Sequence, residues 1–166
     1  KSGFRQARLV LLLFFTLTMP LVIYLGNTEY GYTKTIYTFV YISFLFILWL
    51  VELLLNEDEK ISLTRLSIPA GTLLLAGLLS LINAPSKGVV LQSLGLLVYF
   101  YLTYLLVANT IETEKEARYM MIALVTSGLG ATIYGLLQYL GLARGAHGFS
   151  ARAGSIISVM GNQNYL

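Results

Sequence analysis

The sequence has no cysteine, a single histidine and only three prolines among its 166 residues. Without cysteine the chain can form neither disulfide bonds nor thiolate metal sites. One histidine, His147, leaves too few imidazole groups for a histidine-based metal site. We therefore expect this chain to bind no metal ion.

Charged residues are also scarce, at 11% of the chain, whereas 57% of the residues are hydrophobic and the mean hydropathy is +0.74. A soluble domain cannot hide so much apolar surface, because its exterior must remain largely polar. We therefore place the chain in a lipid bilayer. The net charge of +3 comes without a basic patch interleaved with stacking aromatic residues, so nucleic acid is not expected as a partner.

The few charges divide the chain into five apolar spans, each close to the roughly 20 residues that a helix needs to cross the hydrocarbon core. The spans cover residues 9–28 and 36–55 and the stretches between residues 65 and 87, 87 and 112, and 118 and 144. Backbone groups have no water partners in lipid, so the spans must be helices. The first has the basic lead of a signal peptide but no small-x-small cleavage pattern, which favours an uncleaved helix kinked at Pro20.

This pattern predicts an all-α, polytopic membrane protein with about five transmembrane helices and the start of a sixth. Residues 1–166 form one transmembrane domain, in which residues 143–166 are an outer-face loop and the beginning of the next helix. With the N-terminus in the cytoplasm, seven of the eleven lysines and arginines lie inside, as the positive-inside rule favours. The chain begins with Lys1 instead of methionine and ends without a polar tail, just where a further apolar helix is expected to begin, so we expect an N-terminal portion of a larger membrane domain.

Two sets of side chains suggest how the helices pack. Small residues recur every fourth position at Thr72, Ala76 and Ser80 and again at Ser127, Ala131 and Gly135, which predicts close helix contacts. An aromatic cluster at Tyr99, Phe100, Tyr101 and Tyr104 falls in mid-span. Ordinary packing between helices is the preferred interpretation, and a groove for a lipid tail is the alternative.

The final stretch holds most of the polar chemistry. Arg144, His147 and Arg152 lie in a glycine-rich loop without acids, and the planar guanidinium of an arginine suits phosphate oxygens. Arg152, between the loop and a new apolar segment, is the preferred diphosphate ligand. Arg144 is a second candidate ligand, but for this residue at the helix end a position at the membrane edge or a contact with anionic lipid headgroups is the preferred interpretation. For His147, a plain loop residue is a better interpretation than a general base.

The turn at residues 161–164 adds Asn162 and Asn164 as candidate ligands. A helix that starts here presents free N–H groups to an anion. Capping of that helix by either asparagine is an equally sufficient explanation.

These last motifs resemble the O-antigen ligase and O-antigen polymerase superfamily. The resemblance rests on Tyr134-Gly-Leu-Leu-Gln-Tyr-Leu-Gly-Leu142, then Arg152, then Gly161-Asn-Gln-Asn164. The Asn83-Ala-Pro-Ser86 loop and the charged loop at residues 112–118 are similar too. Gln163 stands where the family usually has proline, which makes the turn less rigid.

The resemblance implies a GT-C-like glycosyltransferase of the bacterial cytoplasmic membrane, active in building lipopolysaccharide and the cell envelope. Such enzymes move a glycan from undecaprenyl diphosphate to an acceptor on the outer face, and they need no metal or other cofactor. The acceptor is a lipid A-core sugar, a growing polysaccharide or a protein. Arg152 matches the first family arginine that binds the donor diphosphate, whereas His147 does not match the acceptor-handling histidine.

Two other classes remain open from the residues alone. A transporter or a small membrane-integral subunit requires charges that face a central path, and Glu52, near a helix end, is the one candidate. A purely structural membrane module is the third possibility.

Overall fold

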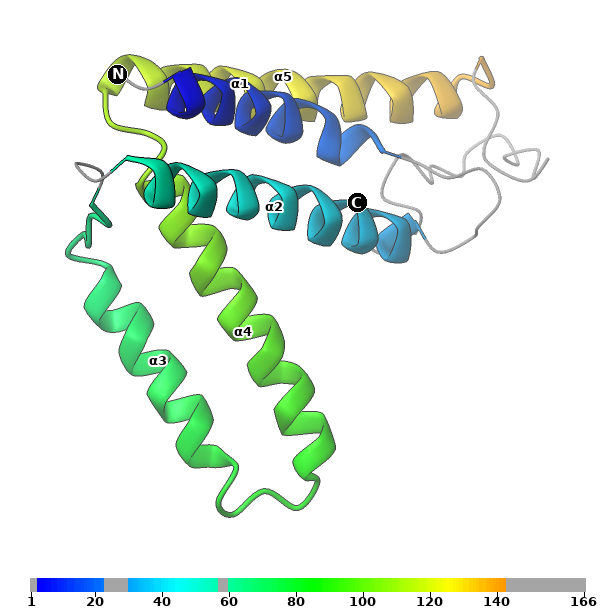
Figure 1. The fold of residues 1–166 in the computed structure, drawn as a ribbon. Coiled ribbons are helices and arrows are strands. Elements are labelled where there is room, and N and C mark those ends of the chain that lie inside the picture. Colours follow the sequence, from blue (N-terminus) through cyan, green and yellow to red (C-terminus); the bar gives the residue numbers. More distant parts are fainter. Residues whose placement is uncertain (1–2, 23–29, 57–59, 143–166) are drawn as a thin grey trace.

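The computed structural model describes residues 3–22, 30–56 and 60–142, and every regular element within them is a helix. The elements are α1 (Gly3–Thr18), the 3-10 turn η1 (Met19–Leu21), α2 (Tyr30–Leu55), α3 (Ser67–Ser80), α4 (Lys87–Ala108) and α5 (Glu114–Tyr139). Helix α1 lies between α2 and α5 and contacts both. Helices α3 and α4 form a hairpin that points away from these three (Figure 1).

Within residues 3–22, 30–56 and 60–142, four segments are long and apolar enough to cross a membrane, which confirms a helical, multi-span protein. They are Gly3–Leu21, Thr33–Leu55, Lys87–Ala108 and Glu114–Tyr139. Helix α3, in the third predicted span, has only 14 residues and is about 21 Å long, against a hydrocarbon core of about 30 Å. The predicted count of five spans is therefore not confirmed.

Two helices begin earlier than the charge pattern predicted. Helix α1 starts at Gly3 instead of residue 9, and α2 starts at Tyr30 instead of residue 36. The prediction treated charges as helix limits. Arg8 and Lys34 instead lie inside helices, because both form hydrogen bonds within the protein.

The charged segment before the last helix is largely part of it. Helix α5 begins at Glu114, so most of the loop predicted at residues 112–118 is its first turn. A capping box explains the start: the Thr113 hydroxyl accepts from the Glu116 N–H, and the Glu116 carboxylate accepts from the Thr113 N–H.

Pro20 was predicted to kink the first helix, and it lies instead in a 3-10 turn that follows the end of the α-helix. Helix α1 ends at Thr18 and the 3-10 turn Met19–Leu21 continues it. At its end the Val22 N–H is shared between the Met19 carbonyl at 3.4 Å and the Thr18 carbonyl at 3.1 Å. Proline has no N–H to donate, so it cannot continue the α-helical ladder.

The apolar core lies where α1, α2 and the C-terminal part of α4 meet. Its buried members are Leu12, Ile42, Leu45, Trp49 and Leu106. Many other apolar side chains face outward, among them Val40 at 67% exposed and Leu73 at 57%. Such a surface suits contact with lipid.

One of the two small-residue stripes packs as predicted. Ser127, Ala131 and Gly135 are all buried on α5. Thr72, Ala76 and Ser80 on α3 are exposed. The prediction that this face of α3 packs against another helix is therefore wrong for the described residues. Gly77 faces α4 instead: a Cβ there would lie 3.1 Å from a Leu94 methyl group. The four-residue spacing of small residues could not show which face meets the neighbour.

Candidate functional site

The four predicted site residues, Arg144, Arg152, Asn162 and Asn164, lie outside the described residues. The structure therefore neither brings them together nor separates them. The segment at residues 143–166, predicted as an outer loop and the start of a helix, lies outside them as well. Within the described part, three features can contribute to function: the end of α5, a groove between α2 and α4, and a buried polar cluster.

The end of α5 explains several residues of the family-like motif. Gly135 and Gln138 are buried. Gly141 has a φ of +72°, which favours glycine, and its N–H donates to the Gln138 carbonyl at 3.0 Å. Leu142 N–H donates to the Leu137 carbonyl at 2.9 Å. These two bonds form a Schellman motif, which ends the helix at a defined residue.

A partly open groove of about 470 Å³ lies between α2 and α4. Its lining is mostly apolar and consists of Met19, Lys34, Thr35, Thr38, Phe39, Leu96, Tyr99 and Phe100. The volume falls within the range of about 300–1,000 Å³ that is typical of small-molecule sites. Tyr99 and Phe100, two of the four clustered aromatic residues, thus line a groove.

Tyr99 joins the two walls of the groove. Its hydroxyl donates to the Thr38 carbonyl at 2.8 Å, and its ring lies 4.3 Å from the Phe39 ring, centroid to centroid. Tyr104, further along α4, lies within hydrogen-bonding distance of the Ser67 hydroxyl at 3.3 Å instead. The aromatic cluster is therefore divided between the groove and the α3–α4 contact.

Among the described residues, Lys34 is the one charged residue that lines the groove. It is 9% exposed, and its ammonium donates to the Pro20 carbonyl at 2.8 Å, at the end of the 3-10 turn. Cations are favoured near the carbonyl end of a helix. The sequence showed only a lysine between two apolar spans, which we assigned to an outer loop.

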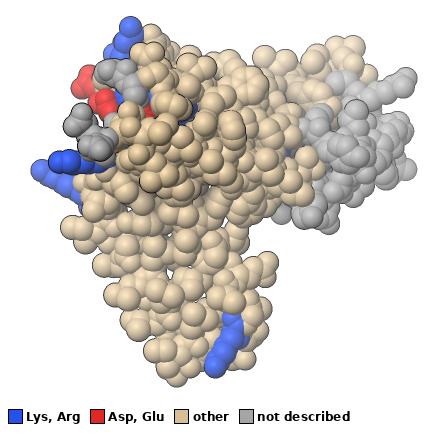
Figure 2. All heavy atoms as spheres, in the orientation of Figure 1, with Lys and Arg blue, Asp and Glu red and all other residues tan. Residues whose placement is uncertain are grey.

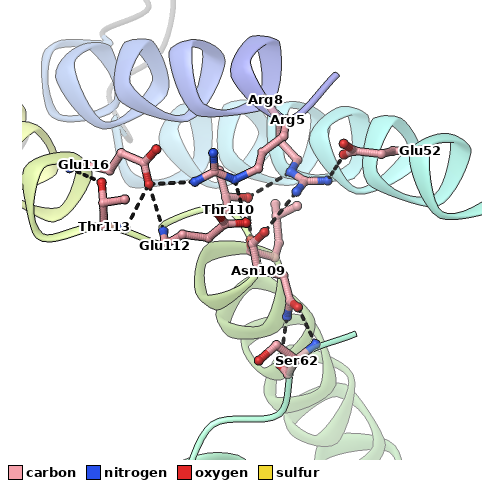
Figure 3. Close-up of polar contacts among 10 residues, drawn as sticks. Arg5, Arg8, Glu52, Ser62, Asn109, Thr110, Glu112, Thr113 and Glu116 are labelled. Carbon is pink, nitrogen blue, oxygen red and sulfur yellow. Dashed lines mark hydrogen bonds and ion pairs between the residues drawn. The ribbon is translucent and has the colours of Figure 1, made fainter. Parts of the chain in front are cut away.

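The buried polar cluster lies at the opposite end of α2 and centres on Arg8 (Figure 3). Arg8 is 1% exposed and forms an ion pair with the equally buried Glu52. Its Nε donates to the Thr110 hydroxyl at 2.9 Å, and a terminal nitrogen donates to the Asn109 carbonyl at 3.0 Å. The guanidinium also lies 5.8 Å from the Trp49 ring centroid, within cation–π range. One side chain thus connects α1, α2 and the segment between α4 and α5.

Arg5 extends this cluster toward α5. A terminal nitrogen donates to Glu116 at 2.7 Å, and its Nε lies 2.9 Å from Glu112 without hydrogen-bond alignment. The same Glu116 oxygen accepts from the N–H groups of Glu112 and Thr113. Glu116 therefore caps α5 and holds α1 at once.

Asn109 fixes the segment of chain before α3. Its amide accepts from the Ser62 N–H at 2.6 Å and donates to the Ser62 carbonyl at 3.1 Å. It also donates to the Leu105 carbonyl at 2.8 Å. The side chain thus pairs with Ser62 as a neighbouring β-strand would, and it ties both ends of the hairpin together.

Sequence reasoning missed this cluster, although signals for it existed. Arg5 and Arg8 are three residues apart, which places them on one helix face, and Glu112 and Glu116 are four apart. The predicted topology put these residues and Glu52 on the same side of the membrane. We used only the basic residues for topology, so the pairing was not considered.

Charged side chains on the surface gather mainly at the end of the molecule that holds the buried polar cluster. Figure 2 shows acidic and basic side chains gathered at the end where α1 begins and α2 ends, beside a wide surface of other residues. Among the residues with described positions, no group of three or more His, Cys, Asp or Glu side chains could hold a metal ion. No protein-family model, curated protein or solved structure matches the chain.

Proposed function

We propose that the chain belongs to a membrane glycosyltransferase similar to O-antigen ligases and polymerases. The enzyme moves a glycan from undecaprenyl diphosphate to a lipid A-core sugar, a growing polysaccharide or a protein. The reaction takes place on the outer face of a bacterial cytoplasmic membrane, with the N-terminus in the cytoplasm and the short α3 hairpin arm counted as a fifth span.

The observation that carries this proposal is the motif at the end of α5. Gly135 and Gln138 are buried, and Gly141 ends the helix through its positive φ. The motif residues therefore have defined physical roles in this protein, in the order in which the family has them. Figure 1 shows that α5 ends at the same end of the molecule at which α2 begins. In the proposed topology this end lies outside, so the chain continues toward Arg152 from the outer side.

In the proposed mechanism, Arg152 binds the diphosphate of the donor. An acceptor hydroxyl attacks the anomeric carbon, the bond from this carbon to the diphosphate oxygen breaks, and undecaprenyl diphosphate leaves with that electron pair. The hydroxyl proton passes, in net terms, to the departing diphosphate. A fixed guanidinium neutralises the charge that develops on the leaving group. Arg144, Asn162 and Asn164 are further candidate ligands for the same anion.

The alternative of a transporter draws less support from the contacts. A transporter requires ionisable groups along a path through the membrane. Glu52, the candidate that the sequence offered, is fully buried against Arg8 instead. Such a pair fits a role in joining helices.

Transfer from undecaprenyl-diphosphate glycan to acceptor, measured with the full-length protein in proteoliposomes, tests the proposal. We expect Arg152→Ala to lower the rate at least about a hundredfold, as loss of a charge-stabilising donor does in other enzymes. Arg152→Lys should also be impaired, because lysine lacks the bidentate fork. Arg65→Ala, at an exposed arginine before α3, is the control and should retain the rate. Normal transfer by Arg152→Ala would refute the mechanism.

A further inference from the structure

We propose that the groove between α2 and α4 binds an anionic glycerophospholipid from the surrounding bilayer. The phosphate lies at the Lys34 ammonium, an ester carbonyl accepts from Thr38, and one acyl chain follows the aromatic lining. This site shares no residue with the diphosphate site proposed above, so either proposal can fail alone.

The depth of Lys34 matches that of a lipid headgroup. Lys34 is the second residue of the span Thr33–Leu55, and Glu52 lies near its other end. At about 1.5 Å per residue the two are about 27 Å apart along the helix, close to the roughly 30 Å of the hydrocarbon core. The ammonium therefore lies at one membrane boundary, where headgroup phosphates are found.

The lining of the groove is charged at one end and apolar beyond it, which matches the headgroup and the acyl chains of a lipid. Lys34 provides the positive charge at one end, and Phe39, Leu96 and Phe100 provide apolar surface beyond it. Phe100 is 63% exposed, so the groove opens sideways and a chain can enter from the bilayer. A lysine at the membrane edge attracts anionic headgroups.

Thr38 favours an ester lipid over other phosphate-bearing lipids. It lines the groove, and its buried hydroxyl has no hydrogen-bond partner among the described residues. A buried hydroxyl without a partner is unfavourable. Thr38 follows Lys34 by one turn, on the same helix face and about 6 Å deeper. The ester carbonyl of a glycerophospholipid lies on the chain side of its phosphate, whereas a polyprenyl phosphate has no carbonyl to offer.

Headgroup selectivity provides the first test. The full-length protein in detergent is mixed with equal amounts of phosphatidylglycerol and phosphatidylcholine, and retained lipid is counted by native mass spectrometry. We expect roughly tenfold preference for phosphatidylglycerol, as a charge-assisted hydrogen bond provides. Lys34→Gln should abolish the preference and Lys34→Arg should keep it, whereas Lys87→Gln, at an exposed lysine outside the groove, should not change it.

The ester contact provides the second test. Thr38→Val, which keeps the side-chain shape, should weaken retention of ester-linked phosphatidylglycerol about threefold to tenfold. Retention of the ether-linked analogue should not change, because it has no carbonyl to lose. Gel filtration and thermal unfolding establish that each variant is folded. Equal retention of the two headgroups by the unaltered protein, or displacement of phosphatidylglycerol by polyprenyl phosphate, would overturn the proposal.

Discussion

The two ends of α2 hold their neighbours by different means. At the Glu52 end, ion pairs and side-chain hydrogen bonds connect α1, the α4–α5 link and the first turn of α5. At the Lys34 end, hydrogen bonds of Lys34 and Tyr37 hold α2 to η1 and α1. Here α2 and α4 separate around a groove, which the hydrogen bond from Tyr99 to the Thr38 carbonyl bridges. Apolar surface contributes little to helix association in lipid, because lipid tails are equally apolar. Polar contacts therefore determine which helix ends stay together.

This difference suggests a division of roles. The Glu52 end fixes the helices, and the α3–α4 hairpin extends from it with its outer faces exposed. Sites that admit ligands are drawn from regions with fewer stabilising contacts. Four substitutions test whether stability is concentrated in this way.

The largest effect is expected at the buried ion pair. Arg8→Met leaves Glu52 without its partner and removes a donor from Thr110, which should lower the free energy of unfolding by about 3–5 kcal/mol. Glu52→Met should cost a similar amount. The double substitution should recover most of the loss, because an apolar pair can replace a buried ion pair. Unfolding in mixed micelles measures all three, and Arg65→Met serves as the exposed control. Additive losses would show that the pair does not act as a unit.

Packing within the hairpin should matter less. Gly77→Leu places a side chain against Leu94 and Leu97, whose methyl groups lie only 3.1 and 3.4 Å from the position that a Cβ at residue 77 would take. Overpacking of this kind costs about 1–3 kcal/mol. Gly71→Leu, on the same helix with no atom within 4 Å of a Cβ, should be close to neutral. Equal stability of the two variants would indicate that α3 and α4 separate readily.

The capping box should contribute about 1 kcal/mol. Thr113→Ala removes the hydroxyl that accepts from the Glu116 N–H, and loss of such a cap typically costs about 0.5–2 kcal/mol. Thr132→Ala, at an exposed position within α5, should cost nothing or stabilise slightly, because alanine favours helix. Thermal unfolding followed by circular dichroism compares them. A loss confined to Thr132→Ala would contradict the capping role.

The smallest effect is expected at the groove. Tyr99→Phe removes the hydrogen bond to the Thr38 carbonyl and keeps the ring, for a loss of about 0.5–1.5 kcal/mol. The distribution of distances between spin labels on α2 and α4 should broaden for labels at the Lys34 end and stay narrow for labels at the Glu52 end. Tyr101→Phe, outside the groove lining, should leave both distributions unchanged. Broadening at both ends would remove the distinction between them.

Much of the secondary structure followed from hydropathy and local signals. Every predicted span contains a helix. Thr113 and Glu116 have the spacing of a capping box, but that signal was not used, and residues 112–118 were predicted as a loop. The predicted helix limits were less accurate. The charge pattern placed Arg8 and Lys34 outside the first two helices, whereas both residues lie inside them. A charge ends a membrane helix only if nothing inside the protein pairs with it, and partners distant in sequence are not visible in a local pattern.

The candidate site shows a similar limit. Ordinary helix packing was the preferred interpretation of Tyr99 and Phe100, with a groove as the alternative, and both residues line a groove. Lys34 and Thr38, from a helix sixty residues earlier, were not connected with them. Arg152 and its neighbours remain a prediction from the sequence.

The sequence by itself determined that the chain is helical and belongs in a membrane, because hydropathy and backbone hydrogen bonding in lipid act on each segment alone. It also determined local stops such as Gly141, whose positive φ requires no distant contact. Only the tertiary structure decided that Arg8 lies against Glu52, that Gly77 faces α4, and that α2 and α4 enclose a groove. These features depend on which helix faces meet, and that choice is made by contacts between residues far apart in the chain.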